Sequence, residues 1–247
     1  MESLENAIEV RHLRKVFGTL KAVDGLDFEL KQGEFLTVFG PNGAGKTTLI
    51  KILAGLTQPS SGTAKVAGFD VAEGHPEMRK EIGIISHATA LYADLTSFEN
   101  LIFFARMHGI EQPEEKALKV IEEVGLSHRR NDRIRTFSRG MLQRLSIARA
   151  VLHDPAILFL DEPFTGLDLH ATNVLKEHLQ RLHDRHRTIL MTTHDISCGL
   201  EMCDKVALQV QGTFAFLKNI ADVDKDRFES MYFDAVRDKQ FAMGIGL

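Results

Sequence analysis

The stretch Gly40-Pro41-Asn42-Gly43-Ala44-Gly45-Lys46-Thr47-Thr48 fits the phosphate-binding pattern G-x-x-x-x-G-K-[ST]. The apolar run at 35–39 before it is typical of a buried strand, and residues 47–54 are typical of a helix. Glycines let backbone N–H groups turn toward phosphates, and the helix N-terminus adds partial positive charge. We expect Lys46 to reach the β- and γ-phosphates and Thr47 to place its hydroxyl on Mg²⁺. The order strand, loop, helix therefore predicts a site for a nucleoside triphosphate such as ATP.

A second apolar run, at 156–160, ends in two adjacent carboxylates, Asp161 and Glu162. Ligand chemistry in parallel sheets gathers at the carboxyl ends of strands, so both side chains are expected near the phosphate loop. Asp161 suits the Mg²⁺ shell, and Glu162 suits polarising or deprotonating the water that attacks the γ-phosphate. The pair favours hydrolysis, with a solvated acidic turn as the alternative interpretation.

A second candidate anion-binding segment lies shortly before that strand. Ser138 and Gly140 stand where a helix is expected to begin, in the run Phe137-Ser138-Arg139-Gly140-Met141-Leu142-Gln143-Arg144. A hydroxyl cap and free N–H groups at a helix N-terminus favour an anion.

Composition narrows the class of protein. The chain has 247 residues and a formal net charge of −4, which fits one large α/β domain and gives no general basic field for nucleic acid. The acidic start, residues 1–5, lacks the layout of a signal peptide, and no apolar run approaches the roughly 18 residues of a membrane span. Two cysteines, Cys198 and Cys203, suit a reducing compartment and are expected to be small core residues. We therefore expect a cytoplasmic protein.

The remaining chain divides by pattern. Residues 8–16 and 19–30 predict a β-rich opening, and 97–150 predict helices inserted between strands. The runs at 156–160 and 188–192 are typical of central parallel strands. Residues 222–236 predict a charged amphipathic helix near the C-terminus.

With these motifs in this order, the chain resembles the nucleotide-binding subunit of an ABC transporter from about residue 8 to residue 212. The resemblance implies an α/β fold: a P-loop NTPase core of ABC type with a mostly parallel sheet, an antiparallel β subdomain and an inserted helical subdomain. It implies a single domain over 1–247. The core with its β subdomain would take about 8–90 and 151–215, the helical subdomain about 91–150, and a helical tail 216–247.

The resemblance also implies residue roles. Gly40 to Thr48 would be the Walker A loop, Asp161 and Glu162 the Walker B carboxylates, and Ser138 with Gly140 the signature. His194 would be the switch histidine that contacts the γ-phosphate, and Phe17 the aromatic that stacks on adenine. The D-loop would be Gly166-Leu167-Asp168.

Two departures from the family pattern affect the site. Phe137, Arg139 and Met141 stand where Leu, Gly and Gln are common, and Arg139 offers a charge contact to phosphate. His87 stands where Gln is usual; a neutral imidazole could accept a hydrogen bond from water near the metal, with a solvent-facing loop histidine as the alternative. His87 and the residues at 94–96 and 99–101 together resemble the corresponding loop of the ABC subunits associated with haem export for cytochrome c maturation.

The resemblance implies partners as well. One phosphate loop and one signature make half of a composite site, so a head-to-tail dimer would hold two ATP molecules. A separate integral membrane permease subunit would dock near the helical lobe and the His87 loop, which places the chain peripherally on the cytoplasmic face of the cell membrane. The alternative is a soluble ABC-type ATPase that acts on nucleic acid or ribosomes, and a small-molecule phosphotransferase is a third interpretation. No nucleic-acid partner is expected.

Weaker signals favour structural roles. His178, His183 and His186 lie in a polar helix and predict a solvated face rather than a metal site. The basic run 129–135 predicts an exposed, salt-bridged surface, with contact to nucleotide or a partner as the alternative.

Overall fold

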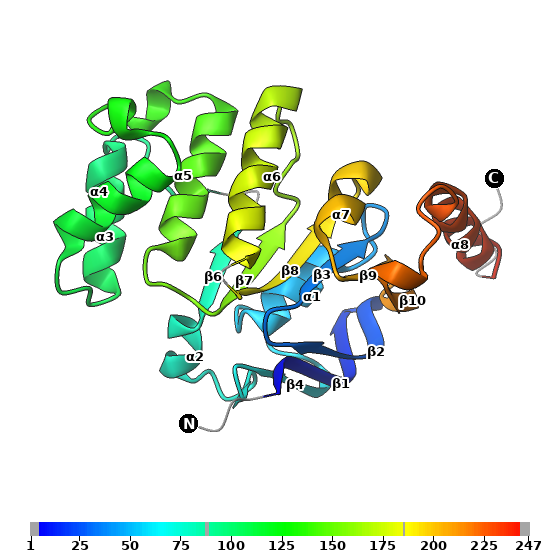
Figure 1. Cartoon of the computed structure of the whole chain (residues 1–247). Helices are drawn as coiled ribbons and strands as arrows, with labels where there is room; N and C mark the ends of the chain where they lie inside the picture. Colours follow the sequence, from blue (N-terminus) through cyan, green and yellow to red (C-terminus); the bar gives the residue numbers. More distant parts are fainter. Residues whose placement is uncertain (1–4, 87–88, 185, 243–247) are drawn as a thin grey trace.

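The computed structural model describes residues 5–86, 89–184 and 186–242 and contains two sheets (Figure 1). The larger sheet has the strand order β10-β9-β3-β8-β7-β6, in which β9, β3, β8, β7 and β6 are parallel and β10 is an antiparallel edge. Its strands are β3 (Phe35–Phe39), β6 (Ile82–Ile85), β7 (Ile157–Asp161), β8 (Thr188–Thr193), β9 (Lys205–Val210) and β10 (Thr213–Asn219).

The smaller sheet is antiparallel and has the order β2-β1-β4-β5. It contains β1 (Asn6–Phe17), β2 (Leu20–Lys31), β4 (Ser61–Val66) and β5 (Phe69–Asp70). Apolar residues alternate along β1 and β2, so one face of this sheet packs against the body while the other meets solvent.

The central strands are buried on both faces because helices and the smaller sheet cover them. Every residue of β3, β7 and β8 is buried. On one face, Phe35 and Leu160 belong to the core that includes α5 (Arg139–Val151) and α6 (Leu169–His183). On the other, Leu36 and Val38 share a core with α1 (Lys46–Leu53) and the smaller sheet.

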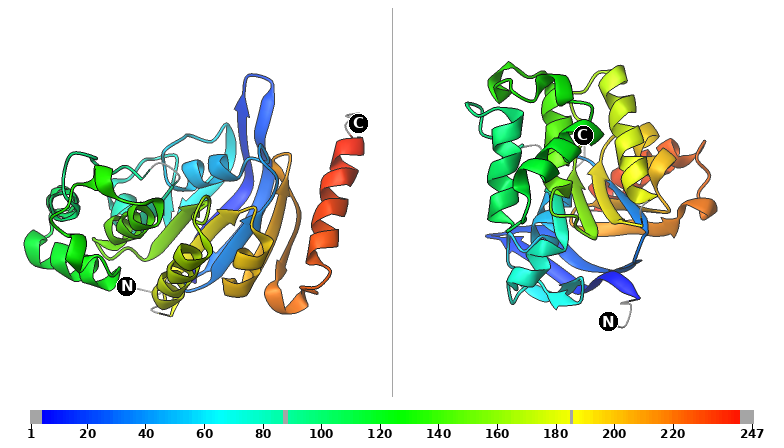
Figure 2. Two further views of the ribbon diagram at one scale, coloured as in Figure 1. Left: turned by 90° about the horizontal axis from the view of Figure 1, so that it is seen from above. Right: turned by 60° about the vertical axis from the view of Figure 1, so that its left-hand side comes forward.

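A helical lobe lies at one end of the molecule, and the C-terminal helix α8 (Phe228–Ala242) lies at the opposite end (Figures 1 and 2). The lobe contains α3 (Ser97–Met107), α4 (Pro113–Glu123) and α5, which pack on one another. Thr96 and Glu99 form a capping box at the start of α3, and Pro113 occupies the first turn of α4, where a missing N–H is tolerated. The remaining helices are α2 (Pro76–Lys80) and α7 (Ile196–Met202).

The expected start of the C-terminal helix at residue 222 is wrong by six residues, because α8 begins at Phe228. Residues Ile220–Asp222 form a 3-10 turn, and the Asp224 carboxylate accepts the N–H of Asp226. Such side-chain to backbone bonds compete with helix formation. Phe228 anchors the helix instead: it is fully buried, 5.0 Å between ring centroids from Phe39.

The expectation that His178, His183 and His186 form a solvated face of one helix is wrong for His178 and His183, and His186 lies beyond the end of α6. His178 is 9% exposed and falls on the helix stripe that includes Leu175 and Leu182, and burial lowers its pKa. The Nε2 atom of His183 lies 2.8 Å from the carbonyl oxygen of Gly33. His186 alone is exposed as expected. Within the described residues, no group of three or more His, Cys, Asp or Glu side chains is placed to hold a metal ion.

Other expectations about structural roles are confirmed. Cys198 and Cys203 are buried, and burial raises the pKa of both thiols to about 11. The basic run is mostly exposed, and Arg129 and Arg135 pair with Asp132 and Asp94. In the part of the chain that the structure describes, none of the helices is long and apolar enough to span a bilayer.

Candidate nucleotide site

The phosphate loop follows β3 and needs glycine at both ends. Gly40 and Gly45 have φ of +156° and +101°. A Cβ on Gly40 would lie 2.1 Å from the carbonyl oxygen of Gln209, and a Cβ on Gly45 would lie 1.9 Å from that of Ala22. No other residue fits these positions, so the close approach of β9 and β2 explains the glycine spacing.

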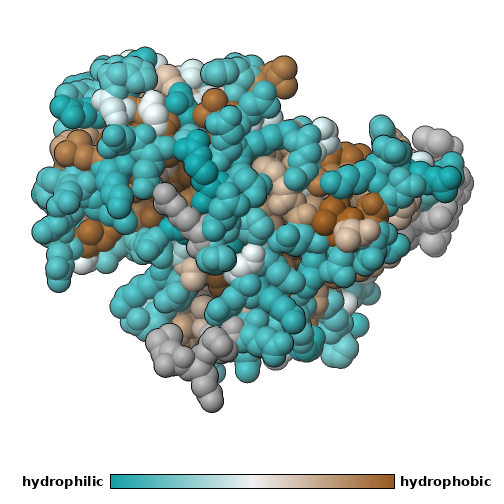
Figure 3. Space-filling model, in the orientation of Figure 1, coloured by the Kyte–Doolittle hydropathy of each residue, from teal (hydrophilic) through white to brown (hydrophobic). Residues whose placement is uncertain are grey.

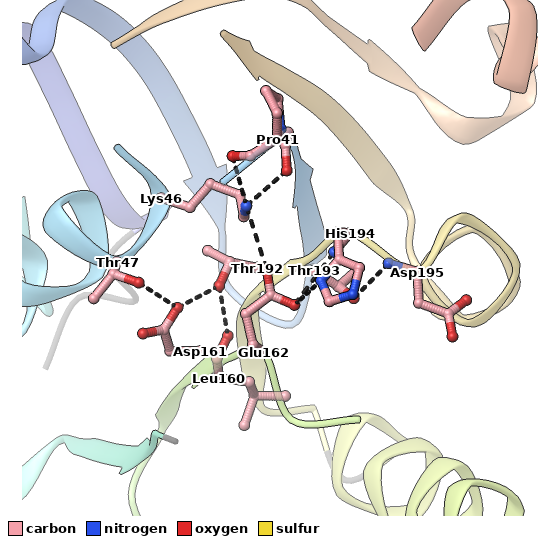
Figure 4. Close-up of polar contacts among 11 residues, drawn as sticks. Pro41, Lys46, Thr47, Leu160, Asp161, Glu162, Thr192, Thr193, His194 and Asp195 are labelled. Carbon is pink, nitrogen blue, oxygen red and sulfur yellow. Dashed lines mark hydrogen bonds and ion pairs between the residues drawn. The ribbon is translucent and has the colours of Figure 1, made fainter. Parts of the chain in front are cut away.

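Lys46 begins α1 directly behind the loop and is 6% exposed. Its Nζ donates to the carbonyl oxygens of Gly40 and Pro41, at 2.7 and 3.2 Å, and forms an ion pair with Oε1 of Glu162 at 3.3 Å (Figure 4). The buried ammonium is therefore held where the loop turns, by partners that a phosphate group can replace.

Thr47 and Asp161 meet as neighbours although 114 positions separate them. The Thr47 hydroxyl donates to Oδ1 of Asp161 at 3.0 Å, and the Thr192 hydroxyl donates to the same oxygen at 2.7 Å (Figure 4). A hydroxyl and a carboxylate beside a phosphate loop form the oxygen donor set that Mg²⁺ takes together with phosphate oxygens. The residues therefore fit a magnesium ion.

Glu162 follows β7 in the left-handed backbone region, with φ of +53°, which is unusual for a residue that is not glycine. Its N–H donates to the carbonyl oxygen of Thr192, and Oε2 lies 2.8 Å from Nδ1 of His194. The carboxylate thus links Lys46 on one side to His194 on the other (Figure 4). Strained backbone of this kind concentrates at functional sites.

The segments predicted to be the signature and the D-loop lie beside each other in the same chain. Ser138 caps α5, because its hydroxyl accepts the N–H of Met141 at 3.3 Å. Asp168 caps α6 by accepting the N–H of Ala171 at 2.7 Å. A Cβ on Gly140 would lie 3.0 Å from the Cβ of Ala171, which brings the two helix starts into contact.

Arg139 has an unexpected neighbour within the chain. Its guanidinium lies against Gly166, where an added Cβ would come within 2.3 Å of Nη1. Within the described residues, no hydrogen bond or ion pair joins Ser138, Gly140 or Asp168 to the phosphate loop.

The other expected residues vary in their placement. Phe17 ends β1 and is 50% exposed, so part of its ring is accessible. The Nζ of Lys15 lies over the ring, 5.0 Å from its centroid. Ala44 is buried, and its carbonyl oxygen accepts the N–H of Gly212 at 2.9 Å. His87 lies outside the described residues. The remaining loop residues Asn42, Gly43 and Thr48 lie in the loop or the first turn of α1.

Sequence reasoning missed Thr192, which lies directly opposite Asp161 in the pairing of β7 with β8. A polar residue near the end of a central strand next to the acidic strand was the available signal. It also missed Gln209, a fully buried residue of β9 that lies against the loop. Nothing in the local pattern around Gln209 indicates that position.

This fold and site define the class of the protein: an α/β nucleotide-binding protein of the phosphate-loop type. Residues 23–165 match the family described as ABC transporter. The chain belongs to this family, as an ATP-binding domain that hydrolyses ATP.

Two relatives agree with this family assignment, and a solved structure shares the fold. The chain is 36% identical to the linearmycin resistance ATP-binding protein LnrL of Bacillus subtilis, over 83% of this chain and 67% of that protein. It is 36% identical to the Nod factor export ATP-binding protein I of Cupriavidus metallidurans, over 81% and 67%. A dimeric ATP-binding cassette in a post-hydrolysis state with ADP and Pi shares the fold, with a TM-score of 0.78 at 23% identity, covering 86% of this chain and 98% of that one.

Proposed function

We propose that this chain is the ATPase subunit of an exporter and that its ATP hydrolysis powers a separate membrane-embedded permease. The observation that carries the proposal is the linked set Lys46, Glu162 and His194 beside Thr47 and Asp161, at the carboxyl edge of the central strands. One relative is named for Nod factor export and another for linearmycin resistance, and the first of these names supports export rather than import.

Each side chain has a role that its surroundings favour. Lys46 holds the β- and γ-phosphates, which displace one or more of its present partners. Glu162 orients and polarises the attacking water, and His194 holds the Glu162 carboxylate and contacts the γ-phosphate. Thr47 and Asp161 would hold Mg²⁺, which neutralises phosphate charge when bound.

Adenine would stack on the accessible Phe17 ring, as aromatic side chains with an open face allow. A role for His87 as a hydrogen-bond acceptor for water near the metal ion remains a prediction.

A head-to-tail dimer would complete the site. In this arrangement Ser138, Gly140 and Asp168 of one copy face the nucleotide held by the phosphate loop of the other, because within one chain they lie apart from that loop. Arg139, exposed beside Gly166, would add positive charge to this second surface. The similarity of the fold to a cassette solved as a dimer supports the proposal.

The permease would dock on the helical lobe. An apolar groove on α3 is lined by Ile102, Phe103 and Met107, with Glu99 and Arg106 at its edge. Met107 is 68% exposed, and Phe103 stacks edge-on against Tyr92. An exposed apolar patch rimmed by charge is typical of a protein interface. The face of the molecule drawn in Figure 3 is mostly hydrophilic and carries several separate apolar patches. The location is then peripheral, on the cytoplasmic face.

Haem as the exported substrate remains a prediction. It rests on loop residues that include His87, and neither relative described above is named for haem.

The test is Glu162→Gln, which keeps the shape of the side chain and removes its charge. We expect ATP binding to persist, turnover to fall by about 10³-fold, and an ATP-dependent dimer to accumulate, because the water is no longer activated. Radiolabelled ATP hydrolysis, calorimetry and size-exclusion chromatography measure the three effects. Glu77→Gln, an exposed residue of α2, is the control and should hydrolyse ATP normally. Full turnover in Glu162→Gln would remove Glu162 from its catalytic role.

Cell fractionation separates the transporter from the alternative soluble ATPase. The proposed function expects the protein in the membrane fraction with an integral membrane partner. Recovery with ribosomes or DNA would favour the alternative.

A further inference from the structure

Strand β9 and the turn that follows it contact the phosphate loop at three points. The carbonyl oxygen of Gln209 blocks any side chain at Gly40, and the Nε2 atom of Gln209 lies 2.9 Å from where a Cβ of Gly45 would be. Just after the strand, the N–H of Gly212 donates to the carbonyl oxygen of Ala44 at 2.9 Å. The loop is therefore packed against Gln209 at both of its ends.

The side chain of Gln209 is unusual for its surroundings. It is 0% exposed, and its neighbours on the strand, Leu208 and Val210, are buried and apolar. Neither the oxygen nor the nitrogen of its amide has a hydrogen-bond partner within the described residues. A buried amide without partners disfavours the folded state, so packing of the sheet alone gives no reason for a glutamine here.

The loop has a reason to change its hydrogen bonds when nucleotide enters. Lys46 now donates to the Gly40 and Pro41 carbonyls and pairs with Glu162, so a phosphate oxygen that accepts from the ammonium must displace one of these three partners. The loop N–H groups also turn toward a bound phosphate, so the polar contacts of the segment from Gly40 to Gly45 change on binding. The Gln209 amide is a buried polar group in contact with this segment that has none of its own.

We propose that Gln209 is a positioning residue of the phosphate loop, whose amide bonds the loop backbone near Gly45 when the loop closes on a nucleotide. In the nucleotide-free protein the Gln209 amide has no hydrogen-bond partner among the described residues. When the loop closes on a nucleotide, its backbone supplies that partner, so nucleotide binding removes an unfavourable contribution to the free energy of the folded state. Gln209 touches no phosphate itself and acts through the loop. This inference rests on nucleotide binding by the phosphate loop and not on the transport role.

The test replaces Gln209 with methionine, which has a similar length and no amide. We expect the nucleotide-free Gln209→Met protein to melt at the same or a higher temperature, since no buried amide is left unpaired. We expect its Kd for Mg-ADP to rise about tenfold, the loss of one buried hydrogen bond to the loop. Calorimetry gives the Kd, and thermal melts with and without Mg-ADP give the stabilisation by ligand, which must shrink in parallel.

The matched control is Leu208→Met, the neighbouring buried residue of β9, whose side chain points to the opposite face of the sheet. It should bind Mg-ADP as the unmodified protein does. Gln209→Leu is the second variant, and it should repeat the effect of methionine.

Three results would overturn the proposal. Equal Kd and equal thermal stabilisation in both Gln209 variants would show that the amide does not hold the loop. Failure of both variants to fold without nucleotide would show that the amide stabilises the unliganded chain. An equal loss in Leu208→Met would indicate general damage to β9. Absence of Mg-ADP binding by the unmodified protein would instead refute nucleotide binding itself.

Discussion

Glu162 combines a strained backbone with two charged or polar neighbours that come from different parts of the chain. Its φ of +53° turns the side chain away from the direction of β7, toward Lys46 and His194. His194 is half-exposed, so its ring can hold the carboxylate and still face a ligand. The position of one carboxylate thus depends on a backbone conformation and on a histidine 32 residues away.

At this scale we predict that His194→Ala lowers the ATPase rate by about 10²-fold, because Glu162 loses the group that orients it. The affinity for ATP should change by only a few-fold, since Lys46 and the loop stay in place. Steady-state hydrolysis and calorimetry measure the two quantities. His186→Ala, an exposed histidine outside the site, is the control. A rate equal to that of the control would show that His194 does not position Glu162.

At the scale of elements, side-chain caps fix the residues at which several helices begin. Ser138, Asp168 and Asp195 cap α5, α6 and α7, and each cap lies in or next to a segment predicted from the sequence to serve the nucleotide site. The capping box of α3 differs, because it lies in the lobe and away from the nucleotide. There Thr96 accepts the N–H of Glu99 at 3.1 Å, and the Glu99 carboxylate accepts the N–H of Thr96 at 2.8 Å.

We predict that Thr96→Ala lowers the free energy of unfolding by about 1 kcal/mol, the usual loss for an N-cap. The hydrogen bond from the Thr96 N–H lowers the pKa of Glu99, as expected for a charged carboxylate in a capping box. Urea denaturation measures the change, and the ATPase rate of the folded protein should remain normal. Glu115→Ala, an exposed residue in the first turn of α4, is the control. Unchanged stability in Thr96→Ala would mean that solvent replaces the cap fully.

At the scale of the whole molecule, two stacked histidines join the helical lobe to the sheet. The rings of His108, after α3, and His153, before β7, are parallel with centroids 4.0 Å apart. The pKa of His153 is lowered to about 4, mainly by burial and also by nearby His108 and Arg149, against opposing contributions from the Ile82 carbonyl and Asp154. Burial also lowers the pKa of His108. Both rings are therefore neutral at pH 7, at the contact between the helical lobe and the segment before β7.

The sign of the pH effect follows from this lowering. The unfolded chain binds a proton at His153 near pH 6.5 and the folded chain only near pH 4, so stability is complete above about 6.5 and is lost as the pH falls toward 4. For a partly exposed group we expect a contribution of about 1 to 2 kcal/mol lost between pH 7.5 and 5. Urea denaturation at both pH values measures it. In His153→Gln this part of the loss should vanish, and an identical pH dependence in the two proteins would contradict the assignment.

The sequence by itself determined the local chemistry. The phosphate loop, the strand that ends in Asp161 and Glu162, and the capped helix starts all depend on residues within one turn or one strand of each other. Neighbours in the chain suffice to predict such features, because glycine conformation, strand burial and capping are short-range effects. The family assignment and the α/β fold follow from the same segments and are confirmed.

Only the tertiary structure decided which distant groups meet. Thr192 reaches Asp161 because β7 and β8 pair in one register, Gln209 reaches the loop because β9 lies beside β3, and α6 turns His178 inward because that face covers the core. The start of α8 likewise depends on the buried pocket that receives Phe228. These outcomes depend on strand order and packing between segments far apart in the chain, which no local pattern of residues specifies.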